Sequence, residues 1–92
     1  MITQRLRIHG LVQGVGFRYA LREQARRQGL SGWVRNRSDG SVEALVQGPP
    51  ERVKELLEWA RHGPPASRVD EVQVEVLAEE APHAGFELRP TV

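Results

Sequence analysis

The sequence predicts an α+β sandwich in which an antiparallel sheet carries two helices on one of its faces. Several short segments alternate between apolar and polar residues, which is typical of half-buried strands. Two longer segments carry apolar residues at helical spacing. The segments follow one another in the order β-α-β-β-α-β, with a short strand at the end, and this order is that of a ferredoxin-like fold. The 92 residues are expected to form one domain over residues 1–92.

The first strand and the first helix lie on either side of a glycine-containing loop. Residues 3–12 alternate, with Leu6, Ile8 and Val12 on one side of the strand and Arg5, Arg7 and His9 on the other. After the loop, apolar residues recur at helical spacing, and this stripe comprises Phe17, Ala20, Leu21 and Ala25. Gly29 is expected to end the helix, because glycine readily adopts the conformation found just after a helix.

Residues 31–48 are predicted to form a hairpin, and two more strands are predicted after the second helix. Two β-prone runs flank Ser38, Asp39 and Gly40, a strong turn signal, so Asp39 and Gly40 are expected to form the turn rather than act in chemistry. The second arm alternates through Val42, Ala44 and Val46. Residues 67–79 alternate again, with Val72, Val74 and Val76 on one face, and Phe86 and Leu88 mark a short last strand.

The second helix is predicted within residues 48–65, which are punctuated at both ends. Pro50 suits a first helical turn, and the charge of Glu51 complements the positive end of the helix dipole there. Gly63, followed by two prolines, is expected to end the helix. The stripe expected to be buried comprises Val53, Leu56, Leu57 and Ala60.

Composition excludes several classes of function. There are 13 basic and 12 acidic residues, a balance that provides no general attraction to nucleic acid or to membranes. The absence of cysteine excludes disulfides and thiolate metal sites. No apolar run is long enough to cross a membrane, and the N-terminus has no signal-peptide pattern, so a cytoplasmic monomer is expected. His9, His62 and His83 are scattered without ligand spacing, and neither a metal nor a cofactor is expected.

The loop before the first helix has the features of an anion site. Gly14 and Gly16 stand directly before Arg18 at the helix start. Free N–H groups at a helix N-terminus favour anions, and glycine lets the backbone approach a ligand closely. An arginine at this positive end of the dipole is unfavourable unless an anion is bound. The pattern therefore favours a binding role for Arg18 over that of a solvated surface residue.

Three known nucleotide or nucleic-acid patterns fit this loop poorly. A Walker A loop needs lysine and a hydroxyl residue where Phe17 and Arg18 stand, and a dinucleotide loop needs a third glycine where Tyr19 stands. An RNA-recognition domain has the same element order, but its aromatic residues must lie on a central strand. Here the aromatic residues fall at a helix start, and Glu43 and Glu75 are expected to share the face of the basic residues. RNA binding is therefore the weakest hypothesis.

Two segments resemble the acylphosphatase family: GLVQGVGFR at residues 10–18 and GWVRNRSDGSVEALVQG at residues 32–48. Both occur in order and at the family's spacing, and the resemblance covers nearly the whole chain. It implies metal-independent hydrolysis of a small-molecule acyl phosphate to a carboxylate and inorganic phosphate, with phosphate as a competitive inhibitor. It also implies that Asn36 positions the attacking water. The implied phosphate-binding residues are Gln13, Gly14, Val15, Gly16, Phe17 and Arg18, and Arg18 and Asn36 are the implied catalytic residues.

The sequence departs from the family pattern at two places. Many members have threonine directly after the asparagine, whereas Arg37 stands here and Ser38 is the nearest hydroxyl. Many end in IRY, whereas this chain has Pro90 in place of the tyrosine and ends in ELRPTV. Two functional classes stay open: an enzyme, and a module that binds an acyl or carbamoyl phosphate without useful turnover. Acylphosphatase-like domains occur inside larger carbamoyl-transfer maturation proteins, and since this sequence shows no extra domain, the enzyme is the expected class.

Overall fold

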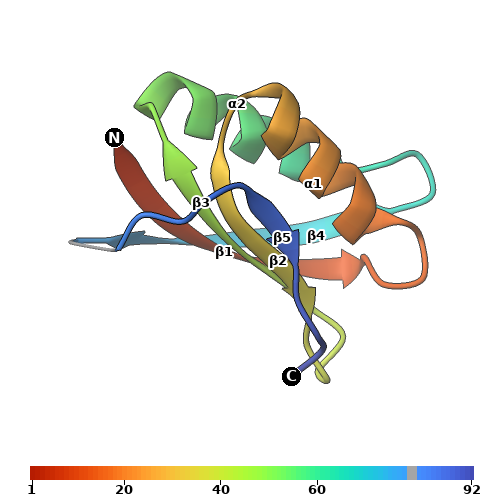
Figure 1. The fold of residues 1–92 in the computed structure, drawn as a ribbon. Coiled ribbons are helices and arrows are strands. Elements are labelled where there is room, and N and C mark those ends of the chain that lie inside the picture. The colour runs from red at the N-terminus through yellow and green to blue at the C-terminus, as the bar shows by residue number, and fades with distance from the viewer. Residues whose placement is uncertain (79–80) are drawn as a thin grey trace.

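The computed structural model describes residues 1–78 and 81–92, and it confirms the predicted sandwich (Figure 1). Two helices cover one face of a five-stranded sheet with the strand order β4-β1-β3-β2-β5. Glu79, at the end of the segment predicted as the fourth strand, lies outside the described residues. The elements are β1 (Ile2–Leu11), α1 (Phe17–Arg27), β2 (Ser31–Asn36), β3 (Val42–Gly48), α2 (Pro50–Ala60), β4 (Arg68–Leu77) and β5 (Phe86–Leu88).

The sheet is mixed rather than wholly antiparallel, so this part of the prediction is wrong. β5 pairs parallel to β2, with Gly32 opposite Phe86 and Val34 opposite Leu88. The other neighbouring strands are antiparallel. β4 therefore runs opposite to β1 and β2, and the chain reverses direction once between β4 and β5. β5 then has to run in the direction of β2 when it pairs with that strand.

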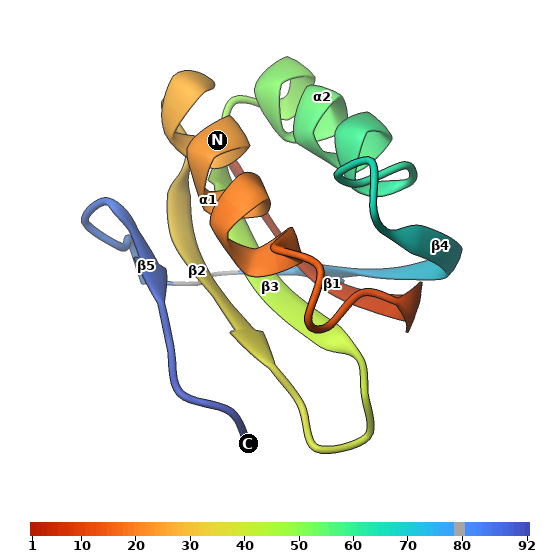
Figure 2. The same cartoon turned by 90° about the vertical axis from the view of Figure 1, so that its right-hand side faces the viewer.

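The core lies between the helices and the sheet. α1 contacts β2 and β5, whereas α2 contacts β1 and β3 (Figure 2). The predicted stripes are confirmed, except that Ala20 and Leu57 are only half-buried. Between the two helices, the Phe17 and Trp59 ring centroids are 5.5 Å apart. The large side chains buried in this layer are Leu6, Ile8, Val12, Phe17, Leu21, Leu30, Val34, Val42, Val46, Val53, Leu56 and Phe86.

The helix boundaries follow from local chemistry. Gly16 precedes α1 as its N-cap, and Pro50 and Glu51 lie in the first turn of α2. After α1, Gly29 has a φ of 69°, and the Leu30 N–H donates to the Ala25 carbonyl at 2.9 Å, as expected for a helix that ends at glycine. No helix among the described residues combines the length and apolar content required to span a membrane.

β4 is less buried than its alternation suggests. Its register places Val72, Val74 and Val76 on one face, as predicted. They lie opposite Ile8, Leu6 and Gln4, so this face is the helix face. Val72 is half-buried, but Val74 and Val76 are 39% and 72% exposed. The reason is that β4 is an outer strand, whereas α2 lies over β1 and β3. The alternation therefore correctly identifies which residues share a face of β4, but it does not show whether a helix covers that face.

Candidate functional site

The loop between β1 and α1 presents open backbone donors. Gly14 and Gly16 have φ values of 75° and 79°, in the left-handed region that glycine adopts at low cost. No side chain caps α1, and its first turn carries no acidic residue. Within residues 1–78 and 81–92, the N–H groups from Gly14 to Tyr19 donate to no carbonyl oxygen. They form an uncompensated array of donors at the positive end of the helix dipole, which suits an anion.

Arg18 lies half-buried in the first turn of α1. Among the described residues, no carboxylate lies within 4.0 Å of its guanidinium. The guanidinium carbon is 5.9 Å from the centroid of the Tyr19 ring, and that of Arg22 is 5.4 Å from it. A guanidinium without a carboxylate partner, beside free N–H groups, offers a forked donor to a phosphate or carboxylate.

Asn36 is the last residue of β2, and it faces the loop across the helix side of the sheet. Its strand partner is Val42, which is fully buried in the core. The Oδ1 atom of Asn36 is buried, and it finds no hydrogen-bond partner in the described part of the chain. Such an atom costs about 1–3 kcal/mol if it stays unpaired, so it calls for a ligand or a water molecule.

A cavity of about 160 Å³ brings these groups together. Arg18 and Asn36, predicted from two distant segments, both line it. Val15 does not line it and packs against the core instead. The Phe17 side chain is buried beside Trp59, which leaves its backbone N–H as the group it can offer. The lining residues are Val12, Gln13, Gly14, Gly16, Phe17, Arg18, Tyr19 and Asn36.

Tyr19 is a cavity residue that sequence reasoning did not select. It lines the cavity and is 56% exposed. Its position directly after Arg18, within the first helical turn, was the available signal. Gln13 was selected, but its side chain points at protein groups: Nε2 donates to the Arg37 carbonyl at 2.8 Å and to the Ser41 carbonyl at 2.9 Å.

The β2–β3 hairpin that presents Asn36 is closed by its own side chains. The Asp39 Oδ1 atom accepts from the Ser41 N–H at 2.9 Å and from the Ser41 Oγ at 2.6 Å. These hydrogen bonds hold the pKa of Asp39 below its usual value. Gly40 has a φ of 93°, as the turn requires. Both residues therefore have the contacts expected of turn formers.

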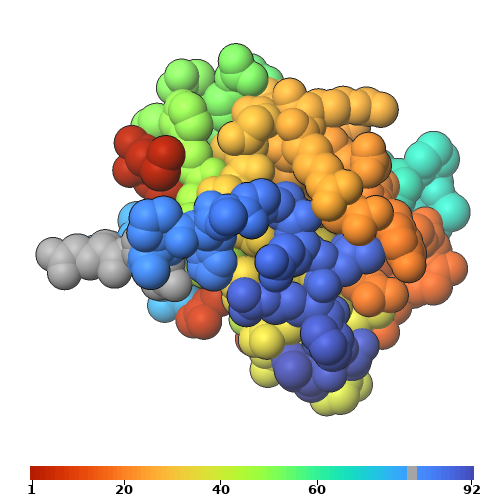
Figure 3. All heavy atoms as spheres, in the orientation of Figure 1, coloured from red at the N-terminus to blue at the C-terminus, as the bar shows by residue number. Residues whose placement is uncertain are grey.

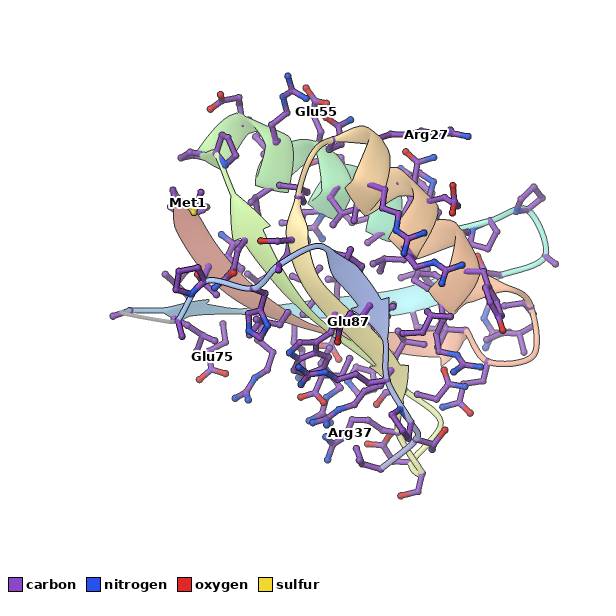
Figure 4. The ribbon with its side chains drawn as sticks, viewed as in Figure 1. Met1, Arg27, Arg37, Glu55, Glu75 and Glu87 are labelled. Atoms are coloured by element: carbon purple, nitrogen blue, oxygen red, sulfur yellow. The ribbon has the colours of Figure 1, made fainter. Side chains whose placement is uncertain are left out.

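The two departures from the family pattern have definite places in the fold. The Arg37 guanidinium lies on the open face of the sheet, away from the helices (Figure 4), and its Nη1 pairs with Glu43 at 3.1 Å. The C-terminal segment runs beside β2 and lies against the hairpin (Figure 3). There the Val92 N–H donates to the Asn36 carbonyl at 3.2 Å, and the Ser38 N–H donates to the Val92 carbonyl at 2.6 Å. The tail therefore contacts the backbone that presents Asn36.

The open face is held by a buried carboxylate. The Glu43 side chain is only 3% exposed and accepts from the Arg35 Nε at 2.7 Å. Burial raises the pKa of Glu43, but the hydrogen bonds from Arg35 and Arg37 outweigh it, and the pKa is lowered overall. Arg5 donates to Glu75 on the same face at 3.0 Å. The expectation that Glu43 and Glu75 share a face with basic residues is therefore confirmed.

The side chains around the cavity include one cation and no carboxylate among the residues described. In residues 1–78 and 81–92, no group of three or more histidine and acidic side chains lies close enough together to hold a metal ion. Backbone N–H groups, one guanidinium and one amide suit a compact oxyanion with several acceptor oxygens, such as a phosphate group.

The fold and the cavity define the class of protein: a small ferredoxin-like α+β sandwich whose donor-lined cavity has a composition compatible with an anion. The acylphosphatase family model matches residues 4–88. An acylphosphatase from Acidovorax sp. is 55% identical over 94 residues, which cover 99% of this chain and 93% of that protein. The chain belongs to the acylphosphatase family, and this confirms the resemblance seen in the sequence.

Solved structures support the same family assignment. The crystal structure of an acylphosphatase from Bacillus subtilis superposes with a TM-score of 0.94 at 37% identity, covering 97% of this chain and 99% of that one. Full-length HypF, in a phosphate- and nucleotide-bound form, contains a similar region with a TM-score of 0.89 and 29% identity. The match covers 98% of this chain but only 12% of the HypF chain.

Proposed function

We propose that this protein hydrolyses the carboxyl–phosphate bond of small-molecule acyl phosphates, releasing a carboxylate and inorganic phosphate. The observation that carries the proposal is the single cavity that joins the open loop donors, Arg18 and the unpartnered Oδ1 of Asn36. The phosphate group is held by the backbone of Gln13, Gly14, Val15, Gly16, Phe17 and Arg18. The planar guanidinium of Arg18 binds two of its oxygens.

Catalysis by this site is positioning and electrostatic stabilisation, which form the larger part of phosphoryl-transfer catalysis. The Asn36 Oδ1 atom accepts a hydrogen bond from water and holds that water against phosphorus. The water oxygen forms a new bond to phosphorus while the phosphorus–acyl oxygen bond breaks, and its electron pair leaves with the carboxylate. An amide is not a base at neutral pH, so the proton of the water passes to a phosphate oxygen. The loop donors and Arg18 stabilise the charge without a metal ion.

The enzyme is expected to be inhibited by its product, to act as a monomer and to be located in the cytoplasm. Inorganic phosphate fits the same donors and is expected to inhibit competitively. The proposal requires no second subunit, since the loop donors, Arg18 and Asn36 meet at one cavity within a single domain, and a monomer is therefore expected. The absence of cysteine is compatible with the cytoplasm, the expected location.

Hydrolysis of benzoyl phosphate in EDTA tests the proposal. Arg18→Ala is expected to lower kcat by about 100-fold or more and to weaken inhibition by phosphate, because it removes a donor to the transferring group. Asn36→Ala is expected to lower kcat but to spare phosphate inhibition. Arg27→Ala, an exposed arginine of the same helix (Figure 4), is the matched control and should leave both unchanged.

The second candidate function is a receptor that binds an acyl phosphate without turnover. The similarity to a small part of the much longer HypF chain favours considering it. Folded wild-type protein that binds phosphate through Arg18 but hydrolyses no acyl phosphate would overturn the enzyme proposal and support this one. Circular dichroism of each variant establishes that loss of activity is not loss of folding.

A further inference from the structure

The Gln13 side chain spans the gap between the β1–α1 loop and the β2–β3 hairpin. Its Nε2 group donates both of its hydrogens, one to the Arg37 carbonyl at 2.8 Å and one to the Ser41 carbonyl at 2.9 Å. Within the described residues, no other side-chain hydrogen bond joins loop residues 12–16 to residues 36–41. These two bonds therefore form the polar connection between the two segments that line the cavity.

The sheet by itself does not hold these two segments together. β1 and β2 are not neighbours, because β3 lies between them. The pairing of β1 with β3 ends at Ile8 and Val42, so the following residues of the loop have no ladder to the hairpin. The loop and the hairpin nevertheless lie at the same end of the molecule (Figure 2).

The two carbonyls that Gln13 contacts flank the catalytic amide on both sides of the hairpin. Arg37 directly follows Asn36, and Ser41 directly precedes Val42, the strand partner of Asn36. The same closing turn contains the bond from the Arg37 N–H to the Ser41 carbonyl at 2.9 Å. Gln13 thus hydrogen bonds to the backbone of the turn that begins directly after β2, one residue from Asn36.

We propose that Gln13 is a positioning residue, whose side-chain amide fixes Asn36 relative to the phosphate loop and does not itself bind phosphate. This inference rests on the proposed function, because it assigns the hairpin contact to the alignment of the attacking water. Phosphate held by the loop and water held by Asn36 come from two separate elements. A displacement of about 1 Å between reacting groups costs about 100-fold in rate.

Kinetics with Gln13→Met test the inference, since methionine keeps the length of the side chain and removes both donors. We expect kcat to fall about 10- to 100-fold, with the inhibition constant of inorganic phosphate changed less than about twofold. In an Asn36→Ala background the same substitution is expected to have almost no further effect, because the group that it positions is gone. Gln24→Met, on α1, is the matched control.

Weaker phosphate inhibition in Gln13→Met, comparable with that of Arg18→Ala, would make the Gln13 side chain a phosphate ligand and overturn the inference. An unchanged kcat, or an equal loss in the Asn36→Ala background, would also overturn it.

A second measurement does not depend on turnover. Asn36 is the only asparagine in the sequence, so labelling with ¹⁵N-asparagine yields a single side-chain amide signal pair. Gln13→Met should shift or broaden this pair, whereas Gln24→Met should leave it unchanged. If the wild type hydrolyses no acyl phosphate, the proposed function fails while this spectrum still reports on positioning. An Asn36 signal that Gln13→Met leaves unmoved would overturn the inference even in an active enzyme.

Discussion

The two faces of the sheet are stabilised by different chemistry. On the helix face, Leu6, Ile8 and Val34 are buried in an apolar layer at 1% exposure or less. The open face carries no helix in the described part of the chain, and arginines surround the buried carboxylate of Glu43 there. The ring of Trp33 on that face contacts two guanidinium groups, whose central carbons lie 4.5 Å (Arg35) and 4.9 Å (Arg89) from the ring centroid.

The comparison shows how the described part of the chain, with two helices on one face, buries residues on both sides of its sheet. The helix face is buried by two helices, whereas on the open face arginine side chains contact Trp33 and Glu43. A planar guanidinium can stack on an aromatic ring and also hydrogen bond to a carboxylate, which lysine does less well. The contribution of the helix face to the free energy of unfolding should therefore depend on packing volume. The contribution of the open face should depend on charge and pH.

The largest difference is expected between two leucines, one on each side of the sheet. Leu21→Ala opens a cavity in a fully buried site, and we expect it to lower the free energy of unfolding by about 2–5 kcal/mol. Leu45→Ala, on the open face opposite Trp33, should cost about 2 kcal/mol, the low end of that range, because Leu45 is 4% exposed but lies outside the apolar cluster under the helices. Urea unfolding of both variants measures this. An equal or larger loss for Leu45→Ala would mean that the open face is a second rigid core.

Acid should lower the free energy of unfolding mainly by protonating the carboxylate of Glu43 on the open face. The pKa of Glu43 is lower in the folded protein than its usual value of 4.5, so the unfolded chain binds its proton more readily. Its contribution to stability is complete above pH 4.5 and is lost as the pH falls through the lowered pKa. Below pH 4.5, the free energy of unfolding should therefore fall less steeply in Glu43→Gln than in wild type.

Asp39→Asn is the comparison variant for the acid prediction. The pKa of Asp39 is also lowered, so the free energy of unfolding should again fall less steeply in acid than in wild type, but by less than for Glu43→Gln because the Asp39 side chain is exposed. Unfolding free energies at several pH values between 7 and about 3, where the carboxylates titrate, separate the two residues. A Glu43→Gln variant with the same acid slope as wild type would show that the open-face network does not titrate with folding.

The smallest change in the free energy of unfolding is expected where an arginine–carboxylate ion pair is exposed to solvent. Arg68 and Asp70 bond at 3.0 Å on β4, but their side chains are 71% and 54% exposed. Arg68→Ala should therefore change the free energy of unfolding by less than about 0.5 kcal/mol. Arg35→Ala, which removes a partner of buried Glu43, should cost clearly more under the same conditions. Similar losses for the two variants would contradict the view that burial decides the strength of these pairs.

The elements and their buried stripes could be predicted from the sequence, because they depend on contacts between residues close in the chain. Helical and alternating periodicities correctly assigned the core residues of β1 and α1, such as Ile8 and Leu21. Glycine conformation and the helix end likewise made the loop around Gly14 and Gly16 recognisable. The two polar side chains proposed to act at the cavity could also be predicted: Arg18 from its place at the helix N-terminus as well as from the resemblance to the family, and Asn36 from that resemblance.

What the sequence alone determined is thus the set of elements, the apolar face of each, and the family to which its motifs belong. Only the tertiary structure decided the parallel pairing of β5, the exposure of Val76 and the burial of Glu43. It alone also decided that the amide of Gln13 connects the loop to the hairpin. The physical reason is that each of these depends on which segments are neighbours in space. Local periodicity carries no information about a partner that is 24 or 28 residues away, as the two acceptors of Gln13 are.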